Sequence, residues 1–197
     1  MKIENRKSKI NQGFTLIELL IVITLLGILA VAVLSAINPI EQINRSRDTS
    51  SRSDAEQLIN AIDRYYATAG FYPWRTSATD EGAGGSVGVD WTAANESWTD
   101  TSTESVVLDK LSSGGYAELK ESFINRISGS TYNTLYVYNR GQQGDSTYVC
   151  FDPASAAFLE EAETRCNINV EEAEQEPLPD DFPSDEACGE TVYSCLP

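Results

Sequence analysis

The 197-residue sequence contains no histidine, and this absence removes a large group of functions. Serine and cysteine nucleophiles that rely on an imidazole base are excluded. The sequence also lacks a CxxC pair, a GxxxxGK[ST] phosphate-binding loop and a GxGxxG turn. Each of these motifs would have indicated a definite chemistry. We therefore predict that the protein is not an enzyme and holds no cofactor.

Basic residues are scarce and are unevenly placed. The chain has 14 Lys and Arg against 30 Asp and Glu, a net charge of −16. Residues 1–13 alone carry +3, so the rest of the chain carries −19. Such an acidic surface repels phosphate, which argues against nucleic acid as a partner. Its simplest interpretation is solubility for a domain outside the cell.

The sequence does contain one long apolar run, from Phe14 to Ile37, with a single charge at Glu18. A helix of this length spans about 36 Å, enough for a bilayer core of about 30 Å. The preceding basic residues favour a cytoplasmic N-terminus and an exported C-terminal domain.

Three interpretations of the run remain. A cleaved secretory signal is suggested by Ala30-Val31-Ala32, but its apolar part would have only about 7–15 residues. A plain signal anchor explains the length but neither Glu18 nor the Gly13 that precedes the run. In the third, cleavage between Gly13 and Phe14 creates a new α-amino group. Glu18, one helical turn away, could then pair with the Phe14 amine of a neighbouring subunit and set the register of a filament.

The residues GFTLIELLIVITLLGILA, which begin at Gly13, resemble the N-terminal signature of type IV pilins and type II secretion pseudopilins. The resemblance implies that a prepilin peptidase cuts after Gly13 and methylates Phe14, and that Glu18 is the assembly residue. It implies a single-pass precursor in the inner (cytoplasmic) membrane and an extracellular homo-oligomeric filament on the cell surface. Its partners would be other copies of the chain, the peptidase and an inner-membrane assembly platform.

Function is predicted accordingly. The first hypothesis is a structural subunit of a type IV pilus-like filament. The alternative within the family is a pseudopilin of a type II secretion or competence system. The alternative from another class is a signal-anchored extracytoplasmic binding domain, which would keep its leader and form no filament.

We expect an α+β fold in which one long, bent N-terminal helix packs on a small antiparallel sheet, as in pilins. The helix kinks would lie at Gly27 and Pro39. The expected parts are a removed leader (1–13), a transmembrane and assembly helix (14–38), an amphipathic half-helix (39–69) and an exported domain (70–197).

Local patterns add detail to this domain. A stripe at helical spacing predicts the buried face of the amphipathic half: Leu58, Ala61, Ile62, Tyr65 and Tyr66. Gly70 should end the helix. Ser53 and Glu56 fit a capping box, so a second helix could start at Ser53. Residues Thr76–Thr103 read as a long loop. Strands are expected on both sides of the turn RGQQGD, which predicts a hairpin.

Four cysteines lie in the C-terminal quarter, and their even number on the exported side predicts two disulfides with three possible connectivities. A zinc site would need an unusual spacing of four cysteines. Pairing between sequence neighbours would give Cys150–Cys166 and Cys188–Cys195.

The same region raises calcium as a candidate ligand, with Asp180, Asp181 and Asp185 as the carboxylates. Some pseudopilins bind calcium in this domain, which the resemblance makes relevant here. No EF-hand spacing is present, and a solvated acidic tail is the alternative.

Overall fold

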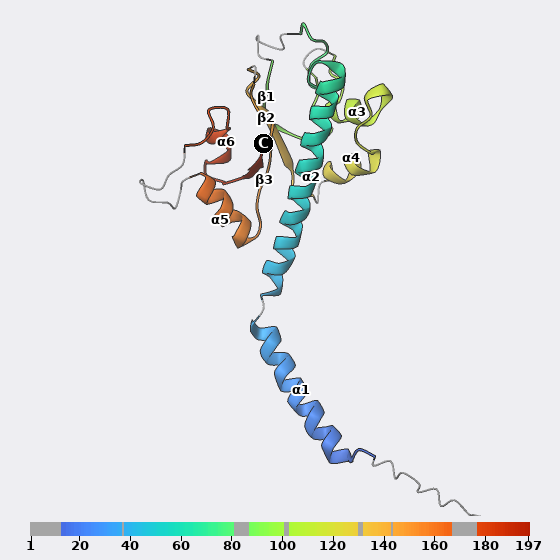
Figure 1. Ribbon diagram of the computed structural model, residues 1–197, viewed down its shortest axis with the longest axis vertical. Helices are drawn as coiled ribbons and strands as arrows, with labels where there is room; N and C mark the ends of the chain where they lie inside the picture. Colours follow the sequence, from blue (N-terminus) through green and yellow to red (C-terminus); the bar gives the residue numbers. More distant parts are fainter. Residues whose placement is uncertain are drawn as a thin grey trace, which may run out of the picture. The chain divides into compact units, whose positions relative to one another are not determined.

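The computed structural model describes seven parts of the chain: residues 13–36, 38–80, 87–100, 103–129, 132–142, 144–166 and 177–197 (Figure 1). The chain forms two compact units, Met1–Ile40 and Glu41–Pro197. We describe each unit by itself. Of the leader predicted at residues 1–13, all but Gly13 lies outside the described residues.

The N-terminal half of the chain forms two helices, α1 (Leu16–Ala36) and α2 (Pro39–Ala69), where we expected one bent helix. α1 continues through Gly27 without a break, so the predicted kink there is not seen as an interruption. At Pro39 the helix restarts. Proline occupies the first helical position, where its missing N–H is not needed, and Asn38 caps the new helix. The Asn38 Oδ1 accepts the N–H of Ile40 at 3.2 Å.

α2 runs unbroken through Ser53, so the capping box expected to start a helix there does not do so. The apolar stripe is confirmed from Leu58 to Tyr65, but Tyr66 is 46% exposed and stacks on Tyr72. Gly70 ends the helix as predicted. Its N–H donates to the Tyr66 carbonyl at 2.8 Å, and its φ of +79° is a conformation that glycine adopts without strain.

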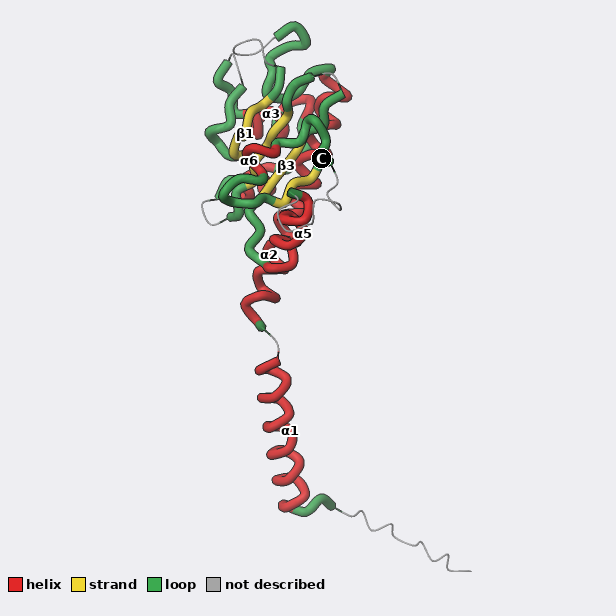
Figure 2. The backbone as a smooth tube through the Cα atoms, turned by 90° about the vertical axis from the view of Figure 1, so that its left-hand side faces the viewer, coloured by secondary structure: helices red, strands yellow, loops and turns green. Residues whose placement is uncertain are grey.

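The sheet is antiparallel and has four strands in the order β1-β2-β3-β4, which Figure 2 shows side by side. The strands are β1 (Val89–Ala93), β2 (Leu135–Asn139), β3 (Tyr148–Phe151) and β4 (Ser194–Leu196). The β2–β3 hairpin is confirmed. β1 lies inside the segment expected to be a loop, and β4 was not expected.

Short helices complete the domain: α3 (Val107–Ser112), the 3₁₀ helix η2 (Gly114–Tyr116), α4 (Glu121–Ile127), α5 (Ala156–Arg165) and α6 (Ser184–Ala187). Helices α2, α3 and α4 lie on one side of the sheet and α6 lies on the other (Figure 1), whereas α5 lies beside the edge strand β4 and also contacts α2 through the Arg52–Glu161 ion pair. β3 is buried on both faces. Its Val149 and Phe151 join the main core with α2, and its Tyr148 and Cys150 join a second cluster with Phe182.

A polar stripe on α2 fixes the start of α5. The fully buried Asp48 carboxylate accepts the backbone N–H groups of Ala154 at 3.1 Å and Ser155 at 2.7 Å, and the Ser155 hydroxyl at 2.5 Å. Glu41, seven residues earlier on the same face, accepts the N–H of Ala156 at 2.9 Å. Because free N–H groups at a helix start favour negative charge, these two carboxylates hold α5 against α2.

Candidate functional site

The candidate site is α1 with the residues that precede it. Leu16–Ser35 is long and apolar enough to cross a membrane, and none of it is buried within the described chain. Its apolar side chains point outward all around the helix; Leu16 is 89% exposed and Leu34 72% exposed. In water such a surface is unfavourable by about 25 cal/mol per Å². The helix therefore requires another apolar environment, either lipid or other helices.

The start of α1 is held by a reciprocal capping box between Thr15 and Glu18. The Glu18 Oε2 accepts the Thr15 N–H at 2.9 Å and the Thr15 hydroxyl at 2.7 Å. In return, the Thr15 Oγ1 accepts the Glu18 N–H at 3.3 Å. The geometry directs the Glu18 carboxylate toward the N-terminal end of the helix, near Phe14. The sequence analysis missed Thr15, although the T-x-x-E pattern was there to be read.

Within Leu16–Ser35, Glu18 is the one ionisable side chain. The two hydroxyl residues of the helix need no outside partner. Thr24 donates to the Ile21 carbonyl at 2.8 Å, and Ser35 donates to the Ala32 carbonyl at 2.9 Å. Glu18 differs from these two residues because it carries a charge. Its hydrogen bonds to Thr15 do not neutralise that charge, and Leu16–Ser35 contains no Lys or Arg that could do so. A carboxylate in this position calls for a positive partner from outside the helix.

Gly13 and Phe14, the residues expected to flank the cleavage site, lie in non-helical backbone before α1. Phe14 is 87% exposed, and a Cβ placed on Gly13 would meet nothing within 4 Å. An extended, uncovered segment of this kind is accessible to an enzyme. The processing role of both residues and the assembly role of Glu18 stay predictions.

The observed disulfide pairing differs from the predicted one. Cys150 pairs with Cys195 and Cys166 pairs with Cys188, and the cysteines described are all bonded. The predicted pairs Cys150–Cys166 and Cys188–Cys195 are therefore wrong. The reason is the unexpected strand β4, which pairs with β3 and places Cys195 directly opposite Cys150.

The calcium candidates are partly committed to other contacts. Asp181 accepts the Ser146 N–H at 2.7 Å and the Tyr148 hydroxyl at 3.0 Å, and so links the C-terminal segment to the sheet. The carbonyl of Asp180 accepts from Arg140 at 2.9 Å. Within the described ranges, no three acidic or cysteine side chains are grouped to hold a metal ion.

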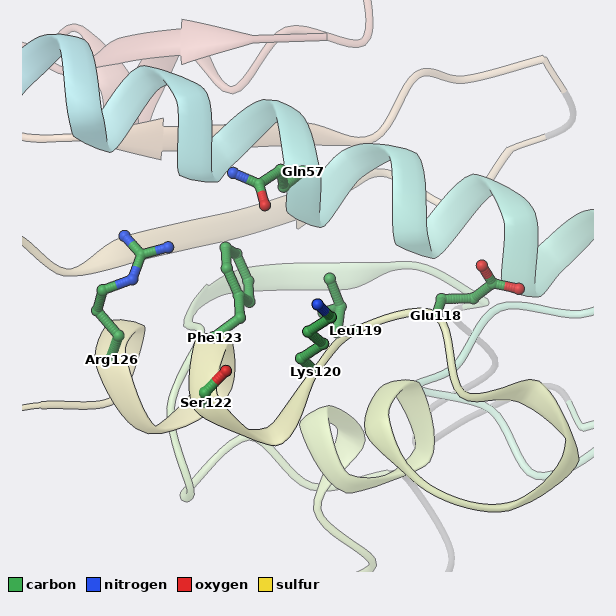
Figure 3. A pocket seen from close by; sticks show the side chains of 7 residues that line it. All are labelled: Gln57, Glu118, Leu119, Lys120, Ser122, Phe123 and Arg126. Atoms are coloured by element: carbon green, nitrogen blue, oxygen red, sulfur yellow. The ribbon is translucent and has the colours of Figure 1, made fainter.

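A groove of about 350 Å³ lies between α2 and α4 (Figure 3). Phe123 and Leu119 supply its apolar part. Two of its charged groups already have partners on α2, since Glu118 pairs with Arg64 and Arg126 pairs with the buried Asp54. Its seven lining side chains include no histidine, cysteine or free carboxylate, so the groove offers no catalytic arrangement.

Comparison with known proteins agrees with the N-terminal site. The family model described as the prokaryotic N-terminal methylation motif matches residues 8–34. The match covers the N-terminal segment of the chain and, together with the pilin-like α+β fold, supports a pilin-type subunit.

A more specific likeness comes from one curated relative. The fimbrial protein EcpC of Eikenella corrodens is 28% identical over 151 residues, which cover 77% of this chain and 89% of the relative. The likeness therefore extends well beyond the N-terminal motif. No solved structure matches the chain.

Proposed function

We propose that the chain is a structural subunit of a type IV pilus-like filament. In this proposal a prepilin peptidase cuts between Gly13 and Phe14, and the processed subunit assembles through α1. The observation that carries the proposal is the combination found in α1. A fully exposed apolar helix has its one charge, Glu18, a single turn after the accessible Gly13–Phe14 segment.

The mechanism follows from the charges. Cleavage would give Phe14 a cationic amine, with an ordinary pKa of about 7.7–8.0. In a bundle of α1 helices, that amine and the Glu18 carboxylate of a neighbour would neutralise each other. Apolar contacts hold the helices together but are non-directional, so they do not set the axial position of one helix relative to the next. The amine–carboxylate pair would set that position.

Location and partners follow from the same helix. Before assembly α1 would span the inner membrane, with the basic leader in the cytoplasm and the second unit outside. An assembly platform would then move the helix from lipid into the filament. Two disulfides in the second unit support an oxidising compartment outside the cytoplasm.

A pseudopilin of a secretion or competence system is the second candidate, because the N-terminal signature is shared. The likeness to a fimbrial protein along most of both chains favours the pilin. Abundant surface filaments built from this chain would support the pilin, whereas a defect only in protein export after deletion would support the pseudopilin.

The first test is mass spectrometry of the N-terminus of the protein purified from its native cell envelope. We expect a chain that begins at N-methylated Phe14. A chain that begins at Met1 would overturn the proposal and leave an anchored binding domain. A start after Ala32 would indicate ordinary secretion.

The second test compares Glu18→Gln with Thr24→Val. The first removes the charge, so the amine of each neighbour is left buried and unpaired, at about 3–5 kcal/mol per contact. We expect normal processing and outer-domain stability but no filaments by electron microscopy. Among the described residues, Thr24 donates to the Ile21 carbonyl of its own helix, so its variant should form filaments normally. Normal filaments from Glu18→Gln would contradict the register mechanism.

A further inference from the structure

The two disulfides are nested. Cys150–Cys195 encloses a sequence separation of 45 residues, and Cys166–Cys188, with a separation of 22, lies wholly inside it. The first and last cysteines of the chain, Cys150 and Cys195, are bonded to each other, and the two middle ones form the inner bond. The connectivity therefore differs from the one that an unfolded chain forms most readily.

Loop-closure entropy gives the size of this difference. Pairing of sequence neighbours closes loops of 16 residues (150 to 166) and 7 residues (188 to 195), against 22 and 45 in the native pairing. The closure cost grows as (3/2)RT ln n. The neighbouring pairing is therefore favoured by roughly 25-fold, or roughly tenfold when the closed inner loop shortens the outer one.

The order of export acts in the same direction. In the orientation proposed above, Cys150 and Cys166 are the first two thiols to reach the oxidising compartment. Cys195, the native partner of Cys150, follows 45 residues later. Oxidation during export would thus join Cys150 to Cys166.

The native fold does little to prevent the Cys150–Cys166 pairing before the bonds form. β4 has only three residues, and its pairing with β3 joins distant parts of the chain, so an unfolded chain has not yet placed Cys195 opposite Cys150. In the folded domain Cys150 is fully buried and Cys195 is 3% exposed, packed with Tyr148 and Phe182. A chain with the wrong pairs cannot form this second cluster.

We propose that the outer domain reaches its native pairing through a thiol–disulfide isomerase, an interaction that goes beyond the filament function. Its substrate is the chain that carries Cys150–Cys166 and Cys188–Cys195. Two equivalents of a disulfide-bearing oxidase first remove four electrons and four protons from the four thiols. The rearrangement that follows is redox-neutral.

The exchange balances in three steps. A thiolate of the isomerase attacks the Cys166 sulfur, forms a mixed disulfide and releases the Cys150 thiolate. That thiolate attacks the Cys195 sulfur, forms the native outer disulfide and releases the Cys188 thiolate. The Cys188 thiolate attacks the Cys166 sulfur, which completes the inner disulfide and returns the isomerase thiolate.

The experiment uses the full chain, reduced and denatured, then diluted into detergent micelles with oxidised glutathione. A bacterial thiol–disulfide isomerase is added to one half. Peptide mass mapping then identifies the covalent pairs, whether or not a given molecule has folded. We expect neighbouring pairs to exceed nested pairs by about tenfold without the isomerase, and the isomerase to reverse this ratio. Nested pairs that dominate equally in both halves would overturn the proposal.

A matched variant separates disulfide exchange from general folding assistance. Cys166→Ser with Cys188→Ser leaves only the outer pair, which has no wrong partner inside the chain. Its Cys150–Cys195 bond should form at the same rate with and without the isomerase. An isomerase requirement that persists in this variant would contradict the exchange mechanism. Filament formation enters neither measurement, so the result is independent of the proposed function.

Discussion

The two helices α1 and α2 follow each other directly in the chain but are stabilised in different ways. α1 is apolar on every side and is exposed throughout. α2 is mostly polar, with one buried face that includes Ala55, Leu58 and Ile62. Tertiary contacts inside the second unit hold α2 in place. The apolar surface of α1 is matched only by an environment outside the described chain, so the same substitution should have different effects in the two helices.

The largest effect is expected for a leucine truncation in each helix. Leu58→Ala leaves a cavity at a fully buried position and should lower the free energy of unfolding of the outer domain by about 2–5 kcal/mol. Leu29→Ala, at a position that is 61% exposed, should leave this quantity unchanged. Denaturant titration of both variants in micelles measures the difference. Equal losses would show that α1 is part of the cooperative unit formed by the outer domain.

The second-largest loss of stability is expected at the polar stripe on α2. Asp48→Ala leaves two backbone N–H groups and the Ser155 hydroxyl without their buried acceptor, at an expected cost of about 2–3 kcal/mol. Glu56→Ala, on the exposed side of the same helix, is the matched control and should cost under about 0.5 kcal/mol. Thermal unfolding distinguishes them. An Asp48 variant as stable as the control would mean that α5 does not depend on this carboxylate.

A pair of glycine substitutions should give a smaller and selective effect. Gly70→Ala forces a side chain into a left-handed conformation, with φ at +79°, and should destabilise the outer domain by about 1 kcal/mol. Gly27→Ala meets nothing within 4 Å and favours the helix by about 1 kcal/mol, so outer-domain stability should not fall. The melting temperatures of the two variants test this. A destabilised Gly27 variant would show that the space beside α1 is already filled.

The smallest expected effect is the loss of stability as Tyr132 and Tyr148 lose their protons at high pH. Burial, followed by hydrogen bonding to Asp54, raises the pKa of Tyr132 to about 12. Burial and a hydrogen bond to Asp181 likewise raise the pKa of Tyr148 to about 12. The unfolded value is about 10. The folded state therefore holds these protons more tightly, and the stability linked to them is complete below about pH 10 and is lost as the pH rises through about 12.

Tyrosinate absorbance should follow this titration in the folded and the denatured chain. Tyr132→Phe and Tyr148→Phe should each remove one late-titrating group. All nine tyrosines of the denatured chain should titrate near the ordinary value of about 10. A single transition near pH 10 in the folded chain would contradict the proposed environments.

Periodic and strongly biased segments could be predicted from the sequence. The apolar run gave α1, the i, i+3, i+4 stripe gave the buried face of α2, and the turn RGQQGD gave the β2–β3 hairpin. Their signals are local because helix and hairpin contacts connect residues close in the chain.

The parts that could not be predicted depend on distant partners. β1 has five residues, VDWTA, in a Gly- and Ser-rich stretch, and it becomes a strand only because β2 supplies its hydrogen bonds. β4 has three residues, too few for a sequence pattern. Because β4 was missed, its cysteine was assigned to the wrong partner. At the candidate site, the sequence predicts roles for Phe14 and Glu18, whereas the hydrogen bonds between Glu18 and Thr15 are seen only in the structure.

The Thr15–Glu18 capping box also bears on the helix macrodipole. The first turn of a helix carries about half a positive charge, and a newly formed amine on Phe14 would add a full positive charge beside it. In the processed subunit that we propose, Glu18 lies within this turn and offsets the added charge inside its own helix. In the bilayer, the N-terminal turn of a single processed subunit would then keep only the half charge of the helix dipole, and each new contact in the filament would pair charges that are already present.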